Sequence, residues 1–141
     1  MLNNRQFILT KQTTELFPHW ESVKLANNYN IYYHPKLRVL LNRDMTFAII
    51  GDVWQVDKQK NSPSTIIDDW HDNTTLDTIY EEEETWCGRF IIVTPDFILT
   101  DATSNLGCFY THDAISSSFA ILAQMIDNER NTPPIAAVPL E

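Results

Sequence analysis

The segment from Trp86 to Tyr110 constrains the fold more than any other part of the chain. Two apolar, β-rich runs, 89–93 and 97–99, are separated by the turn residues Pro95 and Asp96. A loop of small and polar residues follows the second run, and a further short apolar run follows the loop. The pattern predicts a strand, a tight turn, a second strand, an ordered loop and a third strand.

The composition suits one globular domain with a sizeable core. The chain has 141 residues, of which 43% are hydrophobic and 21% are charged. Its formal net charge of -9 argues against binding to nucleic acid or to anionic membrane surfaces, because both repel an acidic protein. No apolar run is long enough to span a membrane, and the N-terminal one is too short for a signal peptide. We therefore expect a cytoplasmic protein.

Apolar runs and turn residues predict further elements on both sides of this segment. We expect strands within 7–9, 27–34, 38–41 and 47–53. Suitable N-caps precede three helical patterns; they are Ser64 for the first, Thr74 or Thr75 for the second, and Ser117 or Ser118 for the third. In the third pattern Phe119, Leu122, Met125 and Ile126 recur at helical spacing and are expected to form one buried stripe.

These elements predict an α+β domain over residues 1–130. The remaining residues, 131–141, contain three prolines without any periodicity and are interpreted as a linker or tail. Alternation on the strands and helical spacing predict a shared core of Phe90, Ile92, Ile98, Phe109, Leu122 and Met125. We also expect Arg89 to form a charge-assisted pair with Asp101.

Three blocks of sequence resemble a known family. They are Tyr32-Tyr33-His34-Pro35, the run from Ile49 to Trp54, and above all the block from Gly88 to Tyr110. Together they resemble the class II glutamine amidotransferase domain of asparagine synthetases, and more closely its divergent copies in bacterial polysaccharide and peptide biosynthesis enzymes. The resemblance implies an N-terminal nucleophile hydrolase-like sandwich, in which two stacked, mainly antiparallel sheets are flanked by helices.

The family's catalytic residues are absent from the matching positions. Where the family has a nucleophilic cysteine as its second residue, this chain has Leu2, which carries no nucleophilic atom. The asparagine-glycine pair that forms the family's oxyanion hole is here Ile50-Gly51, followed by Asp52. We therefore interpret Leu2, Ile50, Gly51 and Asp52 as a vestigial site, without catalytic residues, cofactor or metal.

The resemblance then implies a non-catalytic domain with a structural or docking role. Its partner would be the synthetase domain, or a partner protein, of an ATP-dependent system that forms amides as asparagine synthetases do. One alternative is a stand-alone module that binds a protein or a carbohydrate, for which Trp20, Trp54, Trp70 and Trp86 are candidates. A second alternative is a hydrolase with a relocated nucleophile, either Cys108 or a serine within 116–118.

Two other groups of residues have simpler explanations. Asp68, Asp69, His71 and Asp72 lie close together on a predicted helix and could ligate a metal. We interpret them instead as the polar outer face of a helix whose apolar side chains, Trp70 among them, point inward. Cys87 and Cys108 lack the spacing of a zinc or redox motif and are expected to be reduced thiols.

Overall fold

The computed structural model of the chain describes residues 6–71, 73–101 and 108–131. The described part is an α+β structure with two antiparallel sheets and three helices, as the sequence predicts. The strands are β1 (Phe7–Thr10), β2 (Glu21–Lys24), β3 (Asn30–Tyr33), β4 (Val39–Leu41), β5 (Ala48–Gln55), β6 (Trp86–Val93), β7 (Ile98–Thr100), β8 (Phe109–Tyr110) and β9 (Ala114–Ser116), and the helices are α1 (Pro63–Asp68), α2 (Leu76–Glu83) and α3 (Phe119–Asn131). None of these helices is both long and apolar enough to cross a membrane.

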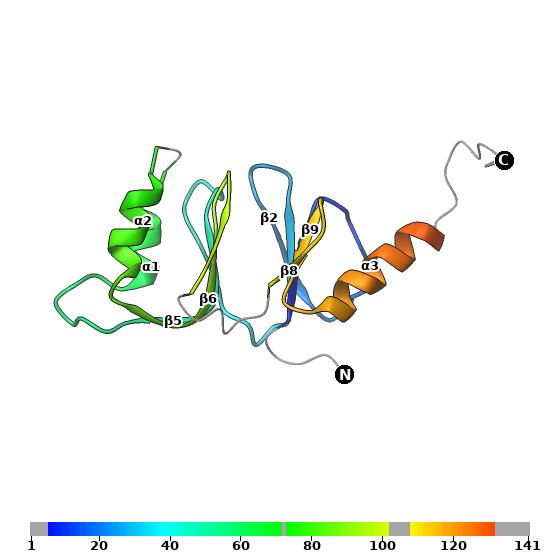
Figure 1. The fold of residues 1–141 in the computed structure, drawn as a ribbon, viewed down its shortest axis with the longest axis horizontal. Helices are drawn as coiled ribbons and strands as arrows, with labels where there is room; N and C mark the ends of the chain where they lie inside the picture. The colour runs from blue at the N-terminus through cyan, green and yellow to red at the C-terminus, as the bar shows by residue number, and fades with distance from the viewer. Residues whose placement is uncertain (1–5, 72, 102–107, 132–141) are drawn as a thin grey trace.

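The two sheets stack face to face between helical layers (Figure 1). One sheet has the strand order β2-β3-β1-β9-β8, and the other has the order β4-β5-β6-β7. Helices α1 and α2 cover the outer face of the β4–β7 sheet, whereas α3 covers the outer face of the other sheet (Figure 1). The described chain therefore has four layers, with helices outermost on both sides.

Three apolar clusters join these layers. The cluster between the sheets combines side chains from both, including Phe7, Ile31, Ile50 and Ile91. The cluster under α1 and α2 is rich in aromatic rings, with Trp70, Trp86 and Phe90 in one group. The cluster under α3 is smaller and comprises Ile8, Phe17, Ala114, Ile121, Leu122 and Met125. Alternate residues of β5 and β6 belong to the first two clusters, so both faces of this strand pair are buried.

Most predicted boundaries are confirmed to within a few residues, with two exceptions. Helix α1 begins after Ser62 rather than after Ser64, because Pro63 occupies the first helical turn, where its missing N–H is not needed. The sequence does not predict strand β2, since Val23 is the only apolar residue in it. Helix α2 begins after Thr75 as expected, and the Thr75 hydroxyl accepts a hydrogen bond from the N–H of Thr78 at 3.3 Å.

The predicted core is correct for four side chains and needs correction for two. Phe90, Ile92, Leu122 and Met125 are buried, but Ile98 is only half-buried. The side chain of Phe109 is 46% exposed, because β8 is a two-residue strand at the edge of its sheet. The buried stripe of α3 is also different from the prediction.

That stripe consists of Ile121, Leu122 and Met125. Phe119 and Ile126, which the helical spacing assigns to it, are exposed. Residues 132–141 lie outside the described residues, and with them most of the predicted linker; Asn131 is the last residue of α3.

Replacing Phe90 and Phe109 by alanine tests this correction. Phe90 is 2% exposed, so Phe90→Ala is expected to lower the free energy of unfolding by about 3–5 kcal/mol, through lost burial and a residual cavity. Phe109→Ala removes the same atoms from a half-exposed ring and should cost far less. Urea denaturation of both variants measures the difference. Equal losses of stability would contradict the placement of the two rings.

Candidate functional site

The described residues of the predicted vestigial site lie on β5. Ile50 is fully buried in the apolar cluster between the sheets. The N–H of Gly51 donates a hydrogen bond to the carbonyl of Arg38 at 2.8 Å and is already used within the sheet. Asp52, the next residue, is half-buried. Leu2 lies outside the described residues.

Two glycines bring β5 and β6 unusually close together at this point. Gly51 has a φ of 115° and Gly88 has a φ of 137°, both in the region that side chains disfavour. A Cβ atom on Gly51 would collide with the carbonyl oxygen of Arg89, and one on Gly88 would collide with that of Asp52. Glycine is therefore required at both positions by backbone packing, independently of any catalytic role.

Acidic side chains gather where β6 and β7 meet the end of α2. Asp101 is buried, and its carboxylate accepts a hydrogen bond from the N–H of Phe90 at 3.1 Å. Among the described residues no ion pair joins Asp101 to Arg89, whose side chain is exposed, so the predicted pair is wrong. Burial, and to a smaller extent the charge of Asp101, raises the pKa of Glu83.

Three of the four candidate relocated nucleophiles, Ser116, Ser117 and Cys108, are engaged elsewhere or are not activated. The hydroxyl of Ser116 is buried and donates to the carbonyl of Phe7 at 2.6 Å. Ser117 accepts a hydrogen bond from the N–H of Phe7 at 3.0 Å. Both serines thus fasten β9 to β1. Burial raises the pKa of the Cys108 thiol, which is the opposite of the change that makes a cysteine nucleophilic.

The histidine and aspartate group predicted on the first helix does not converge. Helix α1 ends at Asp68 with Asp69 as its C-cap, so His71 lies beyond the helix and the predicted placement on it needs correction. His71 Nδ1 lies 3.0 Å from Asp44 Oδ2, and both side chains are more than half exposed. Among the described residues, which exclude Asp72, no three His, Cys, Asp or Glu side chains are arranged to hold a metal ion. Trp70 points inward as predicted, with 2% of its surface exposed.

The tryptophans do not share one surface. Trp70 and Trp86 are buried and stacked on one another, with ring centroids 6.0 Å apart. Trp20 is stacked on Phe17 on the other side of the sandwich. Of the four, Trp54 is the one that is mostly exposed, at 53%. The predicted basis for a carbohydrate surface, a row of tryptophans, is therefore absent from the described structure.

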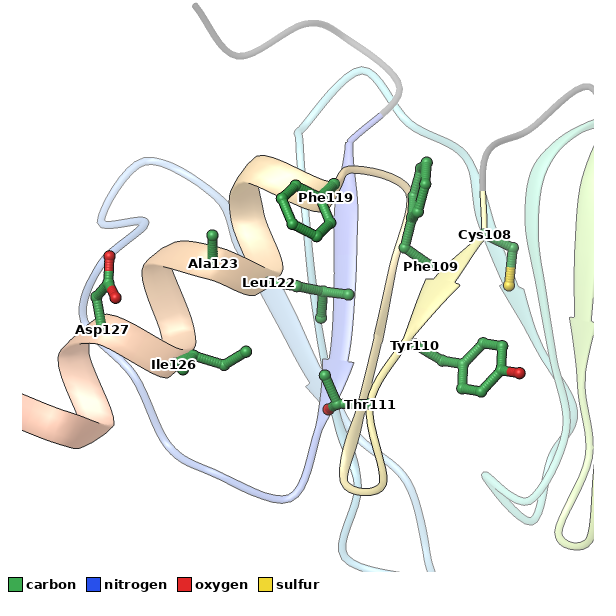
Figure 2. A pocket seen from close by; sticks show the side chains of 9 residues that line it. All are labelled: Cys108, Phe109, Tyr110, Thr111, Phe119, Leu122, Ala123, Ile126 and Asp127. Atoms are coloured by element: carbon green, nitrogen blue, oxygen red, sulfur yellow. The ribbon is translucent and has the colours of Figure 1, made fainter.

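A groove lies between β8 and α3 (Figure 2). It has a volume of about 440 Å³. Phe109 and Phe119 form its rim and pack edge to face, with ring centroids 6.4 Å apart. Leu122 and Ile126 line its helical wall, and Asp127 is its single charged residue. The groove can therefore hold apolar groups.

Large side chains remain exposed at this groove. Tyr110 is 79% exposed and Phe119 is 70% exposed. Phe109 is 46% exposed as well, so three large aromatic side chains stand partly in solvent at or beside the groove. The sequence pattern assigns Phe109 and Phe119 to the core and so does not reveal this surface. The sequence feature that could reveal this surface is the short length of the Phe109-Tyr110 run, which stands just before the turn at His112-Asp113.

Comparisons of the chain with protein-family models, with curated proteins and with solved structures gave no match.

Substituting either glycine of the β5–β6 pair tests the close approach of the two strands. Gly51→Ala is expected to lower the free energy of unfolding by more than about 1 kcal/mol, because alanine is strained at a positive φ and its methyl group meets the backbone of β6. Gly88→Ala should act in the same direction. Urea denaturation measures both effects, and an unchanged midpoint in either variant would contradict the geometry.

The raised pKa of Glu83 predicts how stability depends on pH. The folded protein keeps the Glu83 proton to a higher pH than the unfolded chain does, so the free energy of unfolding rises as pH falls through that window. Glu83→Gln should therefore stabilise the protein at pH 7. The gain should be less than about 1 kcal/mol, since solvent screens a half-exposed group.

Denaturation of the Glu83→Gln variant at two pH values provides the measurement. The gain at pH 7 should disappear near pH 4, where the carboxyl is largely protonated in both states. Glu84→Gln is the matched control, because Glu84 makes the same charge change at an exposed neighbouring position. Equal gains in both variants would show that net charge, rather than burial, is responsible.

Proposed function

We propose that this chain is a non-catalytic docking domain. The observation that carries the proposal is the exposed aromatic groove between β8 and α3, which resembles a protein-binding surface in composition. Aromatic residues are enriched in such surfaces and charged residues are depleted from their centres. Asp127 is the only charged side chain among the groove residues.

The predicted vestigial site supports a non-catalytic role. Ile50, which the sequence resemblance aligns with the oxyanion-hole asparagine, is enclosed in the apolar core. The neighbouring N–H of Gly51 is bonded within the sheet, and Leu2 offers no nucleophile. These features favour a domain that has kept the shape of an amidotransferase without its chemistry.

The partner that fits the sequence resemblance is an ATP-dependent synthetase related to asparagine synthetases. We assign the four-layer sandwich to the N-terminal nucleophile hydrolase-like fold and place the protein in the cytoplasm. The order of layers, with two stacked antiparallel sheets between helices, supports this fold assignment. A carbohydrate-binding role is less well supported, since the tryptophans are dispersed.

We predict that the protein does not hydrolyse glutamine. Incubation with glutamine should release no more ammonia than a heat-denatured control, because no nucleophile occupies position 2. The double variant Leu2→Cys with Ile50→Asn should be equally inactive, because the apolar cluster around residue 50 leaves no open polar pocket. Ammonia release well above the control by the unmodified protein would overturn the non-catalytic assignment.

The docking role is tested with the same preparation. A synthetase polypeptide encoded beside this chain, or following it in the same reading frame and expressed separately, should co-elute with it in size-exclusion chromatography. Separate elution at concentrations well above micromolar would refute the proposed partnership. The ammonia assay is independent of this outcome, so the two parts of the proposal can fail separately.

A further inference from the structure

The hydrogen-bond pattern of the β8–β9 hairpin determines which backbone N–H and C=O groups point outward at the edge of the sheet. The N–H of Thr111 donates to the carbonyl of Ala114 at 2.8 Å, so these two residues form a hydrogen-bonded pair beside the turn. Bonded and non-bonded pairs alternate in an antiparallel ladder. The next pair, Tyr110 with Ile115, is therefore non-bonded. The backbone N–H and C=O of Tyr110 point away from β9, toward the edge of the sheet.

Aromatic side chains stand exposed on both faces of this edge strand. Phe109 points toward α3 and the groove, whereas Tyr110 points to the opposite face (Figure 2). They are 46% and 79% exposed respectively. A ligand lying only in the groove would cover Phe109 and leave Tyr110 in solvent. A strand added in the plane of the sheet would contact both rings.

Charge selects the kind of segment that fits. The chain carries a net charge of -9, and Asp127 lies at one end of the groove. An acidic or neutral segment gains nothing from this field, whereas lysine or arginine residues beside an apolar stretch are attracted to it. A second copy of this acidic chain is disfavoured on the same ground.

We propose that β8 accepts an extended segment of a partner protein as an added strand. The segment carries aliphatic side chains at alternate positions, one of which enters the groove between Phe119 and Ile126, and basic residues at its ends. The backbone of the added segment forms hydrogen bonds with the N–H and C=O groups of Tyr110. This inference rests on the proposed docking function and specifies its mode.

The test uses the full chain and a synthetic peptide of alternating valine and threonine with a lysine at each end. Titration of the isotope-labelled protein is followed by NMR, and the amide signals of β8 and α3 are expected to shift. Tyr110→Pro removes the outward N–H while leaving the bonds to β9, and should weaken binding about fivefold. Phe119→Ser, which opens the groove wall, should also weaken it.

Trp54→Ser is the matched control, because it removes an exposed ring from the other sheet; binding by this variant should be unchanged. A peptide with glutamate in place of lysine should bind more weakly, as should one N-methylated at its central valine. Absence of shifts at millimolar peptide, or shifts spread over the acidic surface, would overturn the inference. So would concentration-dependent dimerisation through β8. Because no synthetase is present, failure here leaves the co-elution result unaffected.

Discussion

The close pairing of β5 with β6 is the constraint on which the rest of the structure depends. These two strands are the longest of the described chain and are paired along their whole length, from Ala48 with Val93 to Gln55 with Trp86. Their apolar residues face the other sheet on one side and the helices α1 and α2 on the other. Gly51 and Gly88 allow the two backbones to approach closely. A side chain at either position would separate the strands and disturb both clusters.

The helical layer over β5 and β6 is attached by polar contacts as well as by packing. Asn42 is buried and uses its whole amide group: Nδ2 donates to Thr46 Oγ1 and to the carbonyl of Trp70, and Oδ1 accepts from the N–H groups of Thr46 and Phe47. The indole N–H of Trp70 donates to Glu82 at 2.6 Å. Burial raises the pKa of Glu82 despite this bond, so α2 is held in place at some electrostatic cost.

Strands buried on both faces could be predicted from the sequence, because their residues form continuous apolar runs. This holds for β5 and β6. The sequence did not predict features that are determined by contacts with distant parts of the chain. Strand β2 is mostly exposed and forms by pairing with β3, in the register of Val23 with Ile31. A run of acids such as the one that contains Glu82 is ordinarily solvated, but Glu82 meets a tryptophan from beyond its own helix. For the predicted vestigial site, the position of Ile50 in the core could be predicted from the alternation of side chains along β5. The positive φ of Gly51 could not.

The two outer faces of the sandwich are covered unequally, and this difference explains where the exposed aromatic groove lies. Two helices cover one sheet, whereas α3 alone covers the other and buries its stripe over β1 and β9. Strand β8 lies beyond that stripe, which leaves the Phe109 and Phe119 rings exposed. Burying the exposed parts of these two rings, roughly 200 Å² in all, would contribute on the order of 5 kcal/mol before the entropy of association is subtracted. Because that entropy and the ordering of a flexible segment cost several kcal/mol or more, an added strand at β8 would bind reversibly. A surface of this size therefore suits a domain that docks on a partner and is released, rather than one half of a permanent interface.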